Sequence, residues 1–117
     1  MSALITLKRK LSSDGSTSKA CVVNLPTINK HINNLAKILK HWATNFQFRR
    51  DGDFIKLLEI NPRISSSTSI RAAFGYNESE MCIEHYLNNK AIHQPKILRG
   101  QASRYIADEI TYDGTYF

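Results

Sequence analysis

The sequence predicts an α+β domain in which an antiparallel β-sheet carries two or three helices packed on one face. Residues 44–50 and 54–60 alternate apolar and polar side chains on either side of Asp51-Gly52-Asp53, which is the pattern of a β-hairpin. Residues 26–42 instead space their apolar side chains three or four apart, as an amphipathic helix does. A chain of 117 residues is long enough for one domain with a modest core.

The first third of the chain is expected to supply a second hairpin and the first helix. Residues 3–10 and 19–23 favour strands, and the polar stretch of residues 12–18 favours the turn between them. The helix begins at Pro26-Thr27 and should lie on the sheet through an apolar stripe made of Ile28, Ile32, Leu35, Leu39 and Trp42.

The hairpin of residues 44–60 should have one polar and one apolar face. A turn of three or five residues would gather its apolar side chains on one face, namely Phe46, Phe48, Phe54, Leu58 and Ile60. The same turn would place Gln47, Glu59 and Asn61 on the other face. We therefore predict an odd-numbered turn, and the pattern leaves open whether Gln47 lies directly opposite Glu59.

The second half of the chain begins where Pro62 ends the hairpin, because proline has no N–H for a ladder. Five hydroxyl side chains at residues 65–69 favour a helix start before Ile70, and Gly75 suits its end. Asn77 and Glu80 then have the spacing of a capping box for a helix that runs to about residue 89. A last strand is expected at residues 105–111, followed by a tail at residues 112–117.

Charge and composition narrow the choice of partners. The chain has 16 Lys and Arg against 10 Asp and Glu, a net charge of +6, which favours nucleotides, phosphorylated substrates or nucleic acid. It has neither a membrane-spanning apolar run nor a secretory signal, so we expect a cytoplasmic protein. Cys21 and Cys82 lack the spacing of a metal site and are expected to be buried thiols. The four histidines are expected to be structural.

Polar side chains converge where the second strand of the hairpin ends. Glu59 and Asn61 point to the same face of an extended chain, about 6.5 Å apart. With Gln47 they offer three oxygen donors, which suits Mg²⁺ or Mn²⁺ shared with phosphate oxygens. Arg63 can fork onto a phosphate, and a helix beginning near Thr68 would present N–H groups to an anion. Taken singly, Glu59 also suits a strand-end salt bridge and Asn61 a turn.

Three segments in this order resemble the C-terminal part of an ATP-grasp domain. They are Asn-Phe-Gln-Phe at residues 45–48, Leu-Leu-Glu-Ile-Asn-Pro-Arg-Ile-Ser at residues 57–65 and Gly-Tyr at residues 75–76. The likeness covers residues 7–105 and is greatest to the large subunit of carbamoyl-phosphate synthase and related carboxylate–amine ligases. It implies that ATP activates a carboxylate as an acyl phosphate, which a nucleophile such as an amine then attacks.

The same resemblance implies roles for five residues. Gln47, Glu59 and Asn61 would hold Mg²⁺ or Mn²⁺ on the phosphates of ATP. Arg63 would be the catalytic residue that contacts the transferring phosphoryl group, and Arg63, Ser65 and Asn61 would bind the nucleotide.

Two departures from the carbamoyl-phosphate synthase pattern matter. That pattern has a further arginine where this chain has Ser66, and Arg71 is no evident replacement, so a different acyl substrate is equally open. ATP-grasp sites also lie between two subdomains, and the chain begins after the adenine-contacting strand. We therefore expect residues 1–111 to be an incomplete C-terminal subdomain, from a split or truncated gene or a longer chain. Catalysis would then need a partner chain with the missing half, or self-association.

Two other functions remain as alternatives. A non-catalytic ATP-grasp remnant would associate with other proteins through the apolar sheet edge that a missing subdomain leaves uncovered. A nucleic-acid binder would use the net charge together with Phe46, Phe48 and Tyr76, but Phe46 and Phe48 are better explained as core. Nucleic acid is therefore not the expected partner, and Mg²⁺-dependent nucleotide binding would distinguish the ligase from the remnant.

Overall fold

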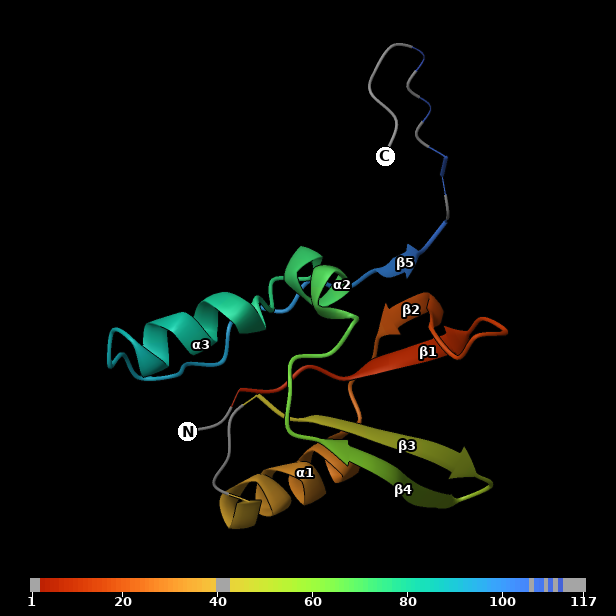
Figure 1. Ribbon diagram of the computed structural model, residues 1–117. Coiled ribbons are helices and arrows are strands. Elements are labelled where there is room, and N and C mark those ends of the chain that lie inside the picture. The colour runs from red at the N-terminus through yellow and green to blue at the C-terminus, as the bar shows by residue number, and fades with distance from the viewer. Residues whose placement is uncertain (1–2, 40–42, 106, 109, 111, 113–117) are drawn as a thin grey trace.

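The computed structural model describes residues 3–39, 43–105, 107–108, 110 and 112, and within them it confirms the α+β class. The antiparallel strands form two sheets, one with the order β1-β2-β5 and one made of β3 and β4 (Figure 1). In chain order the elements are β1 (Leu7–Leu11), β2 (Thr17–Val22), α1 (Pro26–Leu39), β3 (Asn45–Asp51), β4 (Phe54–Asn61), α2 (Thr68–Ala73), α3 (Glu78–Tyr86) and β5 (Gln101–Ser103).

The largest difference from the predicted elements lies at the C-terminal end. The final strand is β5, where Ala102 pairs with Ala20 of β2, and the described residues between 105 and 111 form no strand. The prediction of a strand there is wrong because the position of β5 depends on a tertiary contact: a small side chain fits beside the buried Ala20. Trp42 and residues 113–117 lie outside the described residues.

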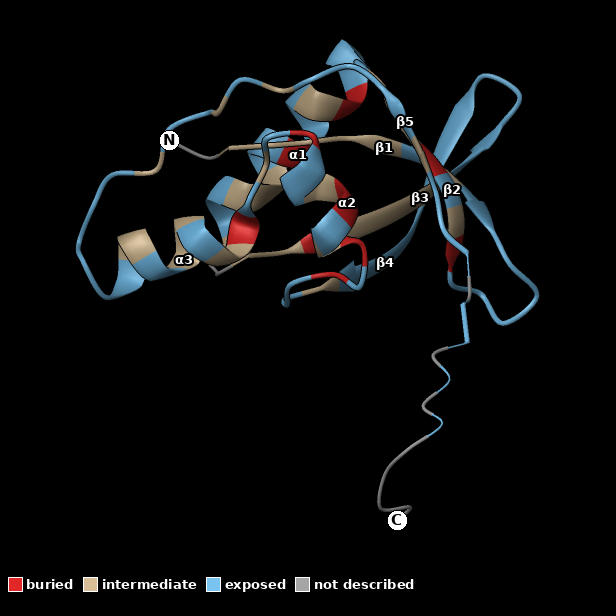
Figure 2. Ribbon diagram, turned by 90° about the horizontal axis from the view of Figure 1, so that it is seen from above, coloured by how far each residue is buried: buried red, intermediate tan, exposed pale blue. Residues whose placement is uncertain are grey.

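The main hydrophobic cluster joins the first sheet to α2. Ala20, Ile70 and Phe74 are buried in it, and further apolar side chains pack around them, namely Ile5, Leu7, Val22 and Ala102. Beside the cluster, the Thr17 and Ser67 side chains are each only 1% exposed, and their hydroxyl oxygens lie 3.1 Å apart in a hydrogen bond. We call β1, β2, β5 and α2 the packed block; Figure 2 shows buried residues on β2 and α2.

The β3–β4 hairpin has the predicted polar face, but its turn and register differ from the prediction. Asp51 pairs with Phe54, so the turn has two residues and the prediction of an odd-numbered turn is wrong. The register then shifts, because Phe48 opposes Leu57 whereas Gln47 opposes Glu59. One residue, Leu58, is left over as a β-bulge. A bulge adds one residue to one strand, so it restores the parity that the odd-numbered turn was predicted to supply.

The bulge also changes the apolar face of the hairpin. Phe54 pairs with Asp51 on the polar side, and Leu58 lies at the bulge, so neither joins Phe46 and Phe48 as predicted. Their places are taken by Ile55, which pairs with Arg50, and by Leu57, which pairs with Phe48, whereas Ile60 lies opposite Phe46 on this face as predicted. The residues of β4 from Phe54 to Ile60 are all exposed (Figure 2), and its outer edge pairs with no strand in the described part of the chain.

Helix α1 lies beside the hairpin (Figure 1), and residues of both line a cavity. Ile28 and Ile32, on the predicted stripe of the helix, are buried. They line the cavity together with Phe46 and Phe48, and its volume is about 870 Å³. The predicted apolar stripe therefore faces the predicted apolar strand, although the space between them is not filled by side chains.

Two other expectations concern cysteines and membranes. Cys21 and Cys82 are both free thiols and are half-buried rather than fully buried. No helix in the described part of the chain is long and apolar enough to cross a bilayer.

Candidate functional site

The polar face of the hairpin carries four side chains in a two-by-two block. Asn45 lies opposite Asn61, and Gln47 lies opposite Glu59, next to the point where Pro62 stops β4. Directly opposed residues in an antiparallel pair have Cβ atoms about 4.5–5.5 Å apart. The structure thus brings the three predicted oxygen donors together on one face, while their role as metal ligands stays a prediction.

The Gln47 side chain makes two hydrogen bonds that fix its orientation. Its Nε2 donates to Glu59 Oε2 over 2.9 Å, and its Oε1 accepts from Arg9 Nη2 over 3.0 Å. A guanidinium can only donate and an ionised carboxylate can only accept, so the amide oxygen must face Arg9 and the amide nitrogen must face Glu59.

Arg9 belongs to β1 and reaches the hairpin from the packed block. Its Nη1 donates to the buried Thr17 Oγ1 over 3.0 Å, which anchors the guanidinium beside Gln47. Burial lowers the pKa of Arg9, and the nearby Arg71 adds to this effect while Glu59 opposes it. The group still carries its charge at neutral pH, because guanidinium does not lose its proton in proteins.

Arg9 was not among the residues predicted for the site, although the sequence carries a signal for it. In the run Lys8-Arg9-Lys10, alternation along a strand places the middle residue on the face opposite the two lysines. Lys8 and Lys10 are exposed, whereas Arg9 is half-buried and lies opposite the buried Ala20. An arginine on the inward face of a strand needs hydrogen-bond acceptors there, and this requirement points to a polar neighbour such as Gln47.

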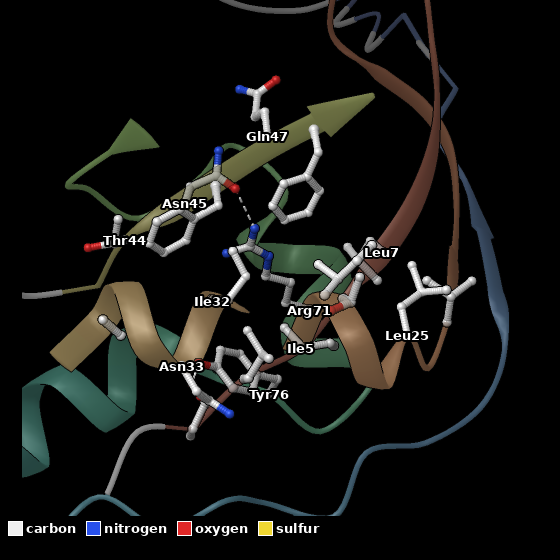
Figure 3. Close-up of a pocket in the computed structure, with 18 of the residues that line it drawn as sticks. Ile5, Leu7, Leu25, Ile32, Asn33, Thr44, Asn45, Gln47, Arg71 and Tyr76 are labelled. Carbon is white, nitrogen blue, oxygen red and sulfur yellow. Dashed lines mark hydrogen bonds between the residues drawn. The ribbon is translucent and has the colours of Figure 1, made fainter. Parts of the chain in front are cut away.

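A second arginine fixes the other amide of β3. Arg71 of α2 donates from Nη2 to Asn45 Oδ1 over 2.7 Å, as the dashed line in Figure 3 shows. Its Nη1 lies 2.7 Å from Oε2 of the buried Glu78, in an ion pair. In Figure 3, Gln47 lies further along the same strand. Arg71 therefore connects α2, α3 and the hairpin, which is a structural role.

Asn61 is held less firmly than Gln47. Its Nδ2 is buried and has no hydrogen-bond partner among the described residues. The two ends of an amide are assigned from their partners, and this nitrogen has no partner to fix it, so the oxygen can occupy the same place. Asn61 can therefore present an oxygen to a cation, and Glu59 supplies the charge that attracts one.

The donor set fits a cation that brings most of its own ligands. In the described part of the chain, no three His, Cys, Asp or Glu side chains lie close enough to form a metal site. One carboxylate and two amides are too few for a closed protein cage, but they suit Mg²⁺ or Mn²⁺ that keeps water and phosphate oxygens.

The two remaining predicted site residues, Arg63 and Ser65, lie on the loop after the hairpin. The Arg63 side chain is exposed, and its Nη1 donates to the Ile64 carbonyl oxygen over 3.3 Å. Ser65 is buried, and its Oγ accepts from the Ser67 N–H over 2.9 Å, which leaves its own O–H able to donate. The structure therefore places Arg63 near the end of β4 and directs Ser65 inward.

The predicted anion site at the start of α2 finds little support. The helix has six residues, and the backbone N–H of Thr68 donates to the Ser65 carbonyl oxygen over 3.0 Å. Together with the bond from the Ser67 N–H to the Ser65 hydroxyl, this engages two of the backbone donors at the start of the helix.

An acid and two amides at the end of a β-hairpin, beside arginines, are the groups with which a protein binds a metal–phosphate ligand. Comparison of the chain with known families identifies the class as ATP-grasp, whose members are ATP-binding, ligase-like domains. The matching family is described as ATP-grasp in the biosynthetic pathway with Ter operon; its model covers residues 2–109, and the chain belongs to this family. Searches of curated proteins and of solved structures found no match. The ATP-grasp resemblance is thereby confirmed, and the likeness to carbamoyl-phosphate synthase stays a prediction.

Proposed function

We propose that the chain provides the metal- and phosphate-binding half of an ATP-grasp ligase that activates a carboxylate as an acyl phosphate. The observation that carries this proposal is the position of Gln47 directly opposite Glu59, with Asn61 on the same face where β4 ends. Ligands on two adjacent strands are held at a nearly constant separation by the ladder between them, which suits binding of one ion by both strands.

Each predicted residue has a role that its chemistry supports. Glu59 and the amide oxygens of Gln47 and Asn61 would hold Mg²⁺ or Mn²⁺, which neutralises charge on the nucleotide phosphates. Arg63, exposed and one residue beyond Pro62, would stabilise the transferring phosphoryl group with its guanidinium. The O–H of Ser65 would donate to a phosphate oxygen.

Arg104 could supply the positive charge that this chain lacks at Ser66 for chemistry like that of carbamoyl-phosphate synthase. Its Nη2 donates to the Ser66 carbonyl oxygen over 2.5 Å, and its backbone N–H donates to the Ser18 carbonyl oxygen. The resembled synthases carry an arginine at the position of Ser66. A guanidinium brought to the same loop from beyond β5 would supply a comparable positive charge for an acyl phosphate, whatever the acyl group is.

We further propose that catalysis requires a second subdomain to cover the nucleotide, on a partner chain or on a second copy. Exposed apolar side chains along β4 favour such a covering, because a solvent-facing sheet edge of this kind normally finds a partner.

The experiment is an assay of ADP release from ATP, with and without the polypeptide encoded immediately upstream. We expect ADP release only from the mixture, and a decrease of about 100-fold in Glu59→Gln because one metal ligand loses its charge. Asp53→Asn is the matched control, since it removes one carboxylate from the exposed turn of the same hairpin.

Two outcomes would contradict the proposal. Full activity of the chain without a partner would show that no second half is needed. Equal activity of Glu59→Gln and Asp53→Asn would show that Glu59 does not hold the metal.

The second candidate function is a non-catalytic module for protein association. It is favoured by β4, where Phe54 is 75% exposed and Leu58 is 62% exposed. Large apolar side chains clustered on one exposed strand mark an interaction surface. A chain that associates with a partner but shows no Mg²⁺-dependent nucleotide binding would support this function over the ligase.

A further inference from the structure

The Gln47 amide points the wrong way for a cation shared with Glu59. Its nitrogen, not its oxygen, faces the carboxylate, with Nε2 2.9 Å from Glu59 Oε2. Its oxygen faces Arg9, with Oε1 3.0 Å from Nη2. A cation needs oxygens from both side chains, so the amide must turn over before Gln47 and Glu59 can bind one ion together.

Arg9 opposes that rotation. If the amide turned over, its NH₂ group would meet the Arg9 guanidinium, and two donors would face each other without an acceptor between them. Arg9 cannot resolve this conflict by deprotonation, and its second nitrogen is anchored to the buried Thr17. A half-buried guanidinium that loses an acceptor bears a desolvation penalty.

An anion would remove that penalty. With Nη1 still bonded to Thr17, the Nη2 released by Gln47 would face the same space as the cation site. A phosphate oxygen accompanying the cation could accept the hydrogen bond that Gln47 gave up, and charge-assisted bonds of this kind are among the stronger ones. A bare cation offers no such acceptor and is also repelled by the guanidinium.

We infer that Arg9 is a positioning residue that locks Gln47 in an orientation unable to bind metal, so that the site admits a divalent cation together with its phosphate and disfavours the cation alone. This inference rests on the proposed metal site. It adds to that site a selectivity for the metal–phosphate complex, which none of the three predicted ligands provides.

The test uses the full chain with MnCl₂ as the probe and paramagnetic broadening of the Asn61 side-chain amide NMR signals as the readout. Arg9→Met removes the lock. Lys8→Met removes the same charge from the exposed, neighbouring position of β1, and Arg9→Lys keeps both a charge and a donor. We expect Arg9→Met to bind bare Mn²⁺ about tenfold more tightly than the wild type, the equivalent of one charged hydrogen bond. Lys8→Met and Arg9→Lys should stay near the wild type.

Addition of inorganic pyrophosphate should favour the wild type over Arg9→Met in the affinity gained for Mn²⁺. The wild type should gain affinity for Mn²⁺ in its presence, whereas Arg9→Met should gain less because it has no guanidinium to donate to the phosphate. Equal gains in the two proteins would overturn the inference.

The failures of the inference and of the proposed site are distinguishable. If Arg9→Met binds Mn²⁺ no better than Lys8→Met while Glu59→Gln abolishes the broadening at Asn61, the inferred role of Arg9 is wrong and the proposed metal site is supported. If the broadening at Asn61 is the same in the wild type and in Glu59→Gln, the metal site is wrong, and the inference fails with it.

Should Arg9→Met not fold, the wild-type protein provides the answer. Titration with Mg²⁺ and pyrophosphate should shift the side-chain N–H signals of Arg9 at the same concentrations that shift the Gln47 amide pair. A Gln47 amide that moves while the Arg9 signals stay constant would overturn the inference.

Discussion

The packed block and the β3–β4 hairpin are built differently. In the packed block, Ala20, Ile70 and Phe74 are buried together, and even the hydroxyl groups beside them are closed off from solvent. In the hairpin, β4 is exposed along nearly its whole length. The candidate site lies on the hairpin, so its residues are placed by a region that has little core of its own.

Two arginines of the packed block hold the hairpin in place, although it has little core of its own. Arg71 of α2 holds Asn45, and Arg9 of β1 holds Gln47, so both amides of β3 are bonded to guanidinium groups of the packed block. No β-ladder joins the two sheets within the described residues. The site is therefore positioned on the packed block by directional polar bonds, which can be exchanged for a ligand more readily than buried apolar contacts can.

The largest expected effect comes from truncating one phenylalanine in each region. Phe74→Ala should lower the free energy of unfolding by roughly 3–5 kcal/mol, because it empties a buried position. Phe54→Ala should change it by less than about 0.5 kcal/mol, since that side chain is exposed. Urea denaturation measures both. Similar losses of unfolding free energy in the two variants would show that the hairpin has a core in solution and is not built differently from the packed block.

The next effect concerns the connection between the regions. Arg71→Met should destabilise the protein by about 3 kcal/mol, because it leaves the buried Glu78 carboxylate without its cation. The double variant Arg71→Met/Glu78→Met should recover much of this loss, since no unpaired charge then remains. Urea denaturation of the two variants checks the prediction. A double variant less stable than Arg71→Met would show that the ion pair matters for more than charge compensation.

A smaller difference in stability is expected between alanine substitutions at two glycines, Gly75 after α2 and Gly52 in the hairpin turn. Both have a positive φ, +88° and +59° respectively, which strains any other residue. A Cβ on Gly75 would lie 2.5 Å from the Lys96 carbonyl oxygen, whereas a Cβ on Gly52 would meet nothing within 4 Å. Gly75→Ala should therefore cost about 2–3 kcal/mol and Gly52→Ala about 1 kcal/mol.

Thermal denaturation of both alanine variants tests this difference. Equal losses would indicate that the backbone near Lys96 moves away without penalty, and that the packed block is less rigid than its burial implies.

The last expected effect is a change of stability with pH. Burial of its phenol raises the pKa of Tyr76 to about 12, and Glu78 adds to the shift. In the unfolded chain the phenol titrates near pH 10. Between about pH 10 and 12 the unfolded state has lost a proton that the native state keeps, so the free energy of unfolding should fall as pH rises. Tyr76→Phe should flatten this slope, and the exposed Tyr105→Phe should leave it unchanged.

Measurement of unfolding by urea at several pH values would decide the Tyr76 prediction. An unchanged slope in Tyr76→Phe would mean that other groups, such as lysines, dominate the alkaline range.

Much of the site could be predicted because it depends on local alternation. Gln47, Glu59 and Asn61 lie two residues apart or on paired strands, and a polar residue among apolar neighbours shows which face it occupies. The bulge at Leu58 could not be predicted, since a bulge and an odd-numbered turn have the same effect on parity. Arg9 was missed because its contact joins residues 38 positions apart.

By itself, the sequence determined the α+β class, the amphipathic first helix and the common face of the three candidate ligands, since each follows from periodicities of a few residues. Only the tertiary structure decided that the strands separate into two sheets, that Gln101–Ser103 form the last strand among the described residues, and that Arg9 holds the Gln47 oxygen. These features depend on contacts between distant segments, where local pattern carries no information about which surfaces meet.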